Sequence, residues 1–334
     1  MTRAITTDAG APSATPPEGA SAVSTQGLTK DYGSGRGLFD LDLEVRAGEV
    51  FGYLGPNGAG KTTTIRLLMD MIRPTRGRAE IFGLDCQARS VEVKRLVGYL
   101  PGELPQFGGL RGREVVSYIA GLRGGVDPAR VTGLARRLDL DLGMRFRQYS
   151  RGTKQKLGLV LAFMHEPRLL ILDEPSSGLD PLNQQEFYRM VAEARERGAT
   201  VFLSSHVLSE VERVCQRIGI IRRGRLVQVA RLEDLHHLRY HSVEVDFSGP
   251  VPVDEVRATS GVEHVTVDGQ RLSLTVRGSF GPLLAALERG QVVNLVSREP
   301  SLEETFLAYY RDDGSGSGDS ATTEPAEPAE RGPG

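Results

Sequence analysis

Nine residues, GPNGAGKTT at positions 55–63, have the types and spacing of a phosphate-binding loop. They follow the apolar run 50–54 and lead into a helical pattern at 64–68, which is the order of strand, loop and helix that such a loop requires. Glycines let successive backbone N–H groups curl round a phosphate chain, and the start of a helix adds free donors. A glycine-rich turn that only caps a helix is the alternative, and the complete GxxxxGK[ST] pattern argues against it. The loop predicts nucleotide binding by Gly55, Pro56, Asn57, Gly58, Ala59, Gly60, Lys61, Thr62 and Thr63.

Two acids, Asp173 and Glu174, end the apolar run 169–172. Four apolar residues in a row suit a central parallel strand, and open α/β sheets bind ligands at the carboxyl ends of such strands. We expect Lys61 to reach the β- and γ-phosphates, and Asp173 to bind Mg²⁺ opposite the Thr62 hydroxyl. Glu174 is then free to orient or deprotonate an attacking water. Stabilisation of a helix N-terminus is the alternative explanation for both acids.

Two more side chains occupy positions that favour a nucleotide. His206 follows the predicted strand 200–203 at the same ligand edge, where an imidazole can hydrogen-bond a γ-phosphate. A structural histidine is the alternative. Tyr32 lies on a glycine-flanked segment, where its ring can stack on adenine, and a half-buried strand residue is the alternative there.

The elements that must hold these residues alternate between strands and helices, as in an α/β protein. Residues from about 105 to 165 are mostly helical in pattern and form an insertion between two strands. Asp180 and Pro181 have the types of an N-cap and a first helical residue, and Gly198 ends that helix. The predicted strands of the core are 41–45, 50–54, 79–82, 96–100, 169–173, 200–203, 218–221 and 225–229.

Composition shifts divide the chain into four parts. Residues 1–24 are rich in Ala, Ser, Thr, Pro and Gly and predict a disordered leader, followed by the α/β core at 25–235. Residues 236–311 predict a small α/β domain with strands near 241–247, 264–267, 272–276 and 292–296 and helices at 280–288 and 302–310. Residues 312–334 predict a disordered acidic tail.

The composition is that of an ordinary globular protein. The 334 residues are 39% hydrophobic and 25% charged, with a net charge of −2. Proteins that bind nucleic acid broadly usually have a strongly basic domain, and this charge balance does not suggest one. Cys86 and Cys215 lie far apart without metal-site spacing, which favours a reducing, cytosolic setting. The apolar stretches fall short of the roughly 20 residues that span a bilayer, and the N-terminus has no apolar signal segment. We therefore expect a soluble protein whose membrane connection comes through a partner.

Taken together, these residues resemble the nucleotide-binding subunit of ABC transporters over about residues 26–235. The resemblance implies a P-loop ATPase core with a mixed sheet and a helical subdomain, followed by the small C-terminal domain. It identifies the phosphate loop as Walker A, residues 169–173 as Walker B, Glu174 as the catalytic-type acid and His206 as the switch histidine. Tyr32 matches the aromatic residue of the A-loop, which favours stacking on adenine. Residues 177–180 match the D-loop.

The segment YSRGTKQKL, residues 149–157, stands in the place of the ABC signature LSGGQ. Ser150 and Gly152 are kept, while Arg151 replaces a glycine and Thr153 the glutamine. This variant is similar to the form common in ABC-2-type exporters, and the motif at 300–307 is similar to the drug- and antibiotic-export branch.

The Q-loop departs further from the family pattern. A glutamine is expected after the strand that ends at Leu100, and the sequence has Gly102, which offers no side chain to Mg²⁺ or water. Glu103 and Gln106 are the candidates to compensate. Leu104, Phe107 and Leu110 follow, either as an apolar contact for a partner or as packing within the helical insertion.

The resemblance also implies a mechanism. Two ATPase subunits, expected to be a homodimer, meet head to tail, so that each ATP and its Mg²⁺ lie between one chain's Walker A and the other's signature. Ser150 and Gly152 then donate hydrogen bonds across the interface, and Asp180 of the D-loop joins the nucleotide-contacting set. Lys61, Glu174 and His206 carry catalysis. A separate membrane permease would turn the motion into export, with the ATPase on the cytoplasmic face. A soluble ABC ATPase acting on ribosomes or DNA is the alternative.

Overall fold

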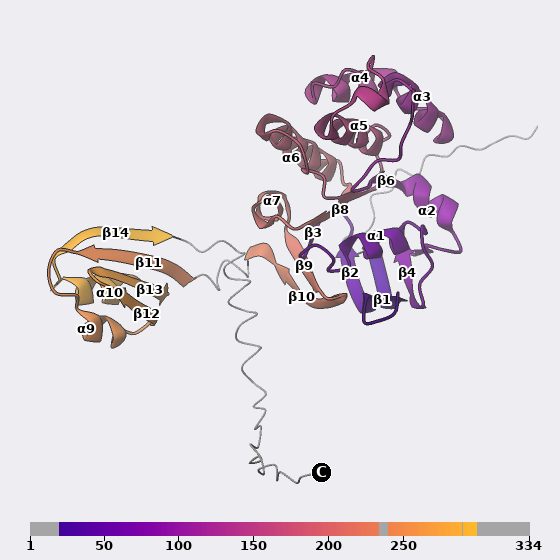
Figure 1. Ribbon diagram of the computed structural model, residues 1–334. Helices are drawn as coiled ribbons and strands as arrows, with labels where there is room; N and C mark the ends of the chain where they lie inside the picture. The colour runs from indigo at the N-terminus through magenta and orange to yellow at the C-terminus, as the bar shows by residue number, and fades with distance from the viewer. Residues whose placement is uncertain (1–19, 234–239, 289, 299–334) are drawn as a thin grey trace, which may run out of the picture. The chain divides into compact units, whose positions relative to one another are not determined.

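The computed structural model describes residues 20–233, 240–288 and 290–298. The chain forms two compact units that divide between residues 237 and 238, and each is described by itself (Figure 1). The predicted boundary at 235/236, the helix at 302–310 and the tail at 312–334 lie outside the described residues.

A six-stranded sheet forms the centre of the first unit, in the order β10-β9-β3-β8-β7-β6. Its middle strands β3 (Val50–Leu54), β8 (Thr200–Ser205) and β7 (Leu169–Asp173) are neighbours, run parallel and are buried at every residue. The outer strands are β6 (Val97–Leu100), β9 (Arg217–Arg222) and β10 (Arg225–Arg231), of which only β10 is antiparallel. Because three adjacent strands run parallel, the loops after β3, β7 and β8 meet at one edge.

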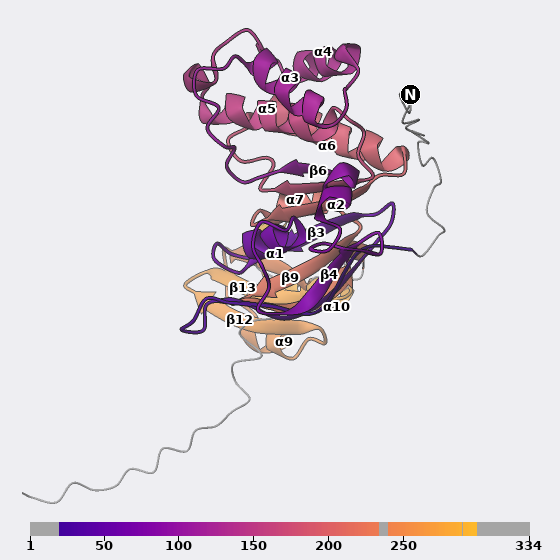
Figure 2. The same cartoon turned by 90° about the vertical axis from the view of Figure 1, so that its right-hand side faces the viewer.

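A second, antiparallel sheet has the order β2-β1-β4-β5, with β1 (Ser21–Asp31), β2 (Gly37–Arg46), β4 (Arg76–Ile81) and β5 (Leu84–Asp85). Helix α1 (Lys61–Leu68) contacts both sheets (Figure 2). Its Ile65, Leu67 and Leu68 belong to the apolar core that the two sheets share. The predicted leader is four residues too long. Strand β1 begins at Ser21, because Ala22 and Val23 are buried where β1 pairs with β2 and β4.

The helical insertion contains α3 (Gly112–Leu122), α4 (Pro128–Arg137) and α5 (Arg151–Phe163), with a 3₁₀ turn at Phe146–Gln148 (Figure 1). Asp127 caps α4 by accepting from the N–H of Ala129, and Pro128 takes the first helical position. The short α2 (Ser90–Leu96) leads into β6. Helix α6 (Pro181–Glu196) lies between β7 and β8 in sequence, and α7 (Leu208–Val214) follows β8.

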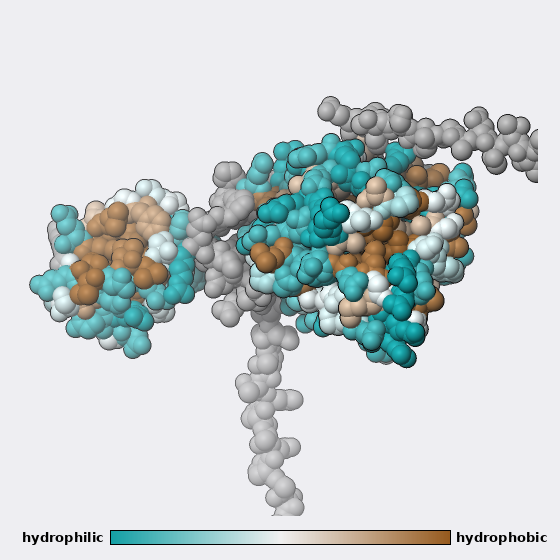
Figure 3. Space-filling model, turned by 90° about the horizontal axis from the view of Figure 1, so that it is seen from above, coloured by the Kyte–Doolittle hydropathy of each residue, from teal (hydrophilic) through white to brown (hydrophobic). Residues whose placement is uncertain are grey.

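The second unit alternates as β11 (Tyr240–Phe247), α9 (Val253–Arg257), β12 (Val262–Asp268), β13 (Arg271–Arg277), α10 (Gly281–Leu287) and β14 (Val292–Arg298). The sheet order β12-β13-β11-β14, antiparallel throughout, is that of a ferredoxin-like fold. Helix α9 was not predicted, since only Val256 of its five residues is buried. Figure 3 shows an apolar area on the surface of this unit. Its exposed apolar side chains include Leu284 and Val293.

Candidate functional site

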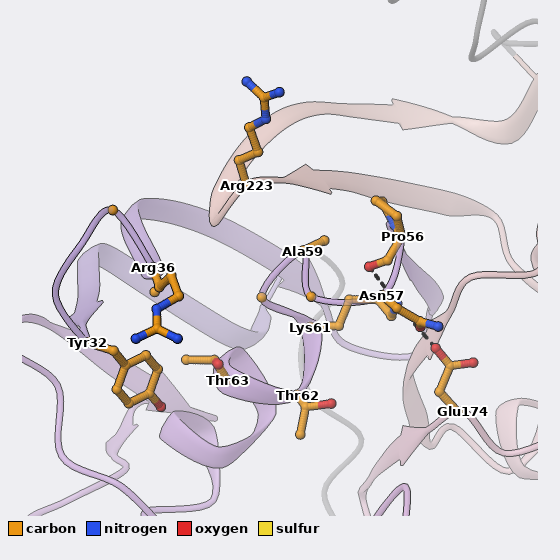
Figure 4. A pocket seen from close by; sticks show the side chains of 14 residues that line it. Tyr32, Arg36, Pro56, Asn57, Ala59, Lys61, Thr62, Thr63, Glu174 and Arg223 are labelled. Carbon is orange, nitrogen blue, oxygen red and sulfur yellow. Dashed lines mark hydrogen bonds and ion pairs between the residues drawn. The ribbon is translucent and has the colours of Figure 1, made fainter.

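The phosphate loop surrounds a pocket of about 530 Å³ at the carboxyl end of β3 (Figure 4). Gly58 and Gly60 have φ angles of 79° and 116°, which L side chains rarely adopt, so these glycines permit the curl that turns backbone N–H groups inward. Helix α1 begins directly afterwards. The lining comprises Tyr32, Gly35, Arg36, Gly37, Pro56, Asn57, Gly58, Ala59, Gly60, Lys61, Thr62, Thr63, Glu174 and Arg223.

Lys61 places its ammonium group inside this loop. Its Nζ donates to the carbonyl oxygen of Gly55 at 2.6 Å and lies 3.2 Å from Oε1 of Glu174. The residue is 5% exposed, so its charge is largely removed from water. Away from water, the attraction between this charge and an anion is stronger. A buried cation held in this way can compensate the charge of a phosphate that enters the pocket.

Asp173 ends β7 with both carboxylate oxygens held. The Thr62 hydroxyl donates to Oδ2 at 2.9 Å, and the Ser204 hydroxyl on the neighbouring strand donates to Oδ1. Asp173 is buried, and Thr62 opens α1 at the pocket. A hydroxyl and a carboxylate brought together are oxygen ligands of the kind that Mg²⁺ takes along with substrate phosphates and water. The pair predicted from sequence therefore meets in the fold and fits this ion.

Glu174 joins two of the predicted residues through one carboxylate. Its Oε2 lies 2.7 Å from Nδ1 of His206, while its Oε1 faces Lys61. Its backbone has a φ of 51°, which costs energy for a non-glycine residue and is typical of functional sites. The Glu174 N–H donates to the carbonyl of Ser204 at 3.1 Å, which fixes this turn to the end of β8. The arrangement places the Glu174 carboxylate in the pocket lining and the His206 imidazole in contact with that carboxylate.

The signature segment begins α5 and packs against the D-loop of its own chain. Ser150 is the N-cap, and its side chain accepts from the N–H of Thr153 at 3.1 Å. Gly152 has no room for a side chain, because a Cβ there would lie 2.4 Å from the carbonyl oxygen of Gly178. Arg151 donates to the Ser177 hydroxyl at 2.8 Å, so the departure at this position supplies a contact to the D-loop.

Asp180 caps α6 rather than facing the phosphate loop. Its carboxylate accepts from the backbone N–H and the side-chain amide of Asn183, and these bonds hold its pKa below the usual range. Among the described residues, neither Asp180 nor the signature residues Ser150 and Gly152 line the pocket of their own chain. Ser150 and Asp180 are solvent-exposed, so they are available to another molecule.

Gly102 lies beside the predicted metal ligand. A Cβ at this position would be 3.4 Å from Oδ2 of Asp173, which is ordinary contact and leaves space for a side chain. Glu103 and Gln106 are exposed, and within the described part of the chain neither makes a side-chain hydrogen bond. Phe107 is half-buried, and its ring packs edge-on against buried Phe146 with centroids 5.2 Å apart. This contact favours packing within the insertion as the explanation for Phe107.

Comparison with known proteins agrees with this geometry. Residues 38–177 match the family model described as ABC transporter. The bacitracin transport ATP-binding protein BcrA of Enterococcus faecalis is 33% identical over 293 residues, which cover 86% of this chain and 94% of that protein. This chain belongs to the ABC transporter ATP-binding family.

Two further comparisons cover much of the chain. The daunorubicin resistance ATP-binding protein DrrA3 of Streptomyces coeruleorubidus is 32% identical over 305 residues, covering 87% of this chain and 96% of that protein. A solved ATP-binding subunit of an ABC transporter superposes with a TM-score of 0.60 at 31% identity, over 64% of this chain and 92% of that one. Membership of the family makes the chain an ATP-binding and ATP-hydrolysing protein with an ABC-type P-loop fold.

The structure also places residues at this ABC site that the sequence did not single out. Arg36 and Arg223 line the pocket, Arg36 on the same loop as Tyr32, which is 49% exposed (Figure 4). Gln155 of the signature helix is buried and donates to the carbonyl oxygens of Glu174 and Pro175 at 3.1 and 3.0 Å. A polar residue on the buried face of a helical pattern was the available signal for Gln155. None of the helices in the described part of the chain could span a membrane.

Proposed function

We propose that this chain is the ATPase subunit of an exporter and drives efflux of a small molecule through a separate membrane permease at the cytoplasmic face. The similarity to a bacitracin transport and a daunorubicin resistance ATP-binding protein, over nearly the full length of each, carries the proposal. Nod factor export ATP-binding protein I of Cupriavidus pinatubonensis, 32% identical over 84% of this chain, supports export as the common theme.

Within this proposal, the residues at the carboxyl edge of the sheet divide the binding and hydrolysis of ATP between them. Lys61 and the loop N–H groups bind the β- and γ-phosphates, and the Tyr32 ring at the mouth of the pocket stacks on adenine. Thr62 and Asp173 hold Mg²⁺, which when bound neutralises charge on the phosphate oxygens. Glu174 orients the attacking water and accepts its proton. His206, held 2.7 Å from Glu174, contacts the γ-phosphate and keeps the carboxylate directed at the water.

The exposed signature supports a dimer in which a second copy completes the site. Ser150, Gly152 and Asp180 do not line the pocket of their own chain, so in a head-to-tail pair they would meet the nucleotide of the partner copy. The close packing of Gly152 on Gly178 joins the signature to the D-loop, so both would move together. We propose that the ATPase domain extends from the start of β1 at Ser21 to residue 235, and that the accessory domain spans residues 236–311.

A susceptibility assay tests the exporter proposal. The source strain is deleted for this gene and complemented with the wild type, with Lys61→Ala or with the surface control Lys94→Ala, and is exposed to a panel of peptide and anthracycline antibiotics. We expect the wild type and Lys94→Ala, but not Lys61→Ala, to restore resistance and reduce drug accumulation. Equal accumulation in all strains, with the ATPase sedimenting with ribosomes or DNA, would instead support the soluble alternative.

A further inference from the structure

Glu210 is a buried carboxylate next to the catalytic edge with no part in the mechanism above. It lies in the first turn of α7, four residues after His206, and is 2% exposed. Its Oε2 accepts a hydrogen bond of 2.6 Å from the Ser205 hydroxyl. Its Oε1 is buried and has no hydrogen-bond partner among the described residues.

Burial of the Glu210 carboxylate costs desolvation free energy. A carboxylate removed from water favours its neutral form, and burial accordingly raises the pKa of Glu210, although the hydrogen bond from the Ser205 hydroxyl opposes this shift. Leaving one oxygen unpaired adds a further desolvation cost. An apolar residue of similar size would fill the same space with a smaller desolvation penalty, so the stability of the fold does not explain why an acid occupies this position.

The bond that Glu210 makes closes the loop carrying His206. The Ser205 hydroxyl donates to Glu210 and at the same time accepts from the backbone N–H of Val207 at 2.9 Å. One hydroxyl thus joins the two neighbours of His206 in sequence and anchors both to α7. Ser205 is fully buried at the end of β8, so the anchor rests on the rigid sheet.

His206 depends on this loop for its position. Its side chain is 47% exposed, and the hydrogen bond it makes is the 2.7 Å contact to Glu174. An exposed imidazole with one hydrogen-bond partner in the described part of the chain has little packing to hold its ring, so the backbone at 205–207 sets where it lies. Moving that backbone by about 1 Å would move the ring off the Glu174 carboxylate, and displacements of that size can lower a rate about 100-fold.

We propose that Glu210 is a positioning residue that holds His206 on Glu174 by anchoring the Ser205–Val207 turn to α7. The proposal rests on the catalytic task proposed for His206. Because Glu210 is not among the residues that line the pocket, we expect its loss to change the hydrolytic step and to leave nucleotide binding in place.

Steady-state kinetics of the purified full chain with ATP and Mg²⁺ test the inference. We expect Glu210→Ala to lower kcat roughly ten- to hundredfold with KM within about twofold of wild type. Glu210→Gln keeps an oxygen that can accept from Ser205 and should recover most of the activity. Glu212→Ala, on the same helix but without that bond, is the matched control and should behave as wild type. Ser205→Ala removes the anchor from the other side and provides a second variant if Glu210→Ala fails to fold.

A double-mutant cycle separates positioning from general stability. If Glu210 acts through His206, then Glu210→Ala adds no loss of kcat to His206→Ala, whereas independent effects multiply. Multiplying losses, or wild-type kcat in both Glu210→Ala and Ser205→Ala while His206→Ala is impaired, would overturn the inference. Wild-type kcat in His206→Ala would instead remove the proposed task of His206 itself.

Discussion

The two units of this chain differ in what they bury. The ATPase unit encloses polar and charged side chains in or near its catalytic edge and its sheets, whereas every buried side chain in the described part of the C-terminal unit is apolar. In the C-terminal unit the charges stay at the surface and pair there, Asp246 with Arg271 and Glu263 with Arg277. The buried polar residues of the first unit are Thr25, Thr29, Lys61, Thr64, Gln155, Asp173, Asn183, Thr200, Ser204, Ser205 and Glu210.

This difference distinguishes buried residues that serve the chemistry of the site from buried residues that serve only packing. Burying Lys61, Asp173 or Glu210 costs free energy that an apolar side chain would not, and each lies within one or two contacts of the phosphate loop or of Glu174. Val243, Val245 and Phe247 of β11 only fill the space between the second unit's sheet and its helices. We therefore expect substitutions of the buried charged residues at the catalytic edge of the first unit to alter turnover, and substitutions in the apolar core of the second unit to alter stability alone.

The largest effect is expected at Lys61. Lys61→Ala removes the buried cation that faces the phosphates, and loss of one such preorganised group lowers kcat roughly 10²- to 10³-fold. ATPase rates and ATP affinity by calorimetry measure it, with Lys94→Ala as the control for loss of an exposed positive charge. A Lys61→Ala chain with wild-type rate and affinity would end the assignment of this loop.

The opposite pattern is expected at Leu274 of β13, which is buried in the C-terminal core. Leu274→Ala should lower the free energy of unfolding of that unit by about 2–5 kcal/mol while leaving kcat within about twofold of wild type. Calorimetric melting and limited proteolysis measure the first, and ATPase assays the second. Leu284→Ala, at an exposed position of α10, is the control. If kcat falls together with stability, the two units are not separable in this way.

A smaller, pH-dependent effect is expected at His165, just after α5. Burial lowers the pKa of this imidazole to about 4, whereas the unfolded chain takes up the proton near pH 6.5. The unfolded state therefore binds more protons as the pH falls between these values, and the free energy of unfolding decreases by up to about 3 kcal/mol.

Urea unfolding at about pH 7 and about pH 4.5 compares the wild type with His165→Gln, which has no proton to take up. We expect the variant to lose less stability than the wild type on acidification. His264→Gln, at an exposed position of β12, should leave the acid dependence of the wild type in place. Equal acid sensitivity in His165→Gln and wild type would show that other groups control it.

The sequence was sufficient to predict the parts of the site that follow strand ends. The phosphate loop and Asp173 come directly after apolar runs, and His206 follows the predicted strand 200–203 by three residues. Parallel neighbours bring such strand ends together, as β3, β8 and β7 confirm. Membership of the ABC family is likewise confirmed by the relatives. The catalytic tasks of these residues stay predictions.

Contacts between distant segments could not be predicted in the same way. Glu210 and Glu212 are the same residue type two positions apart in one short helix, and nothing in the sequence distinguishes a buried acid from a more exposed one. Only the packing of α7 shows that Glu210 is the buried one. The two bonds of Gln155 to the turn at Glu174 depend on how α5 lies against β7, which no local pattern specifies. The core also starts four residues earlier than the predicted boundary at residue 25 for a related reason, because residues at the start of β1 are held by pairing with β2 and β4.

The central claim is that the buried edge of the ATPase unit is a hydrolytic site which a second copy of the chain completes. Glu174→Gln tests it most directly, because this change keeps the shape of the side chain and removes the base. We expect the variant to bind ATP, to hydrolyse it at least about 100-fold more slowly than wild type, and to elute as a dimer in size-exclusion chromatography with light scattering when ATP and Mg²⁺ are present. A variant that binds ATP and stays monomeric at saturating nucleotide, or that turns over at the wild-type rate, would contradict the claim.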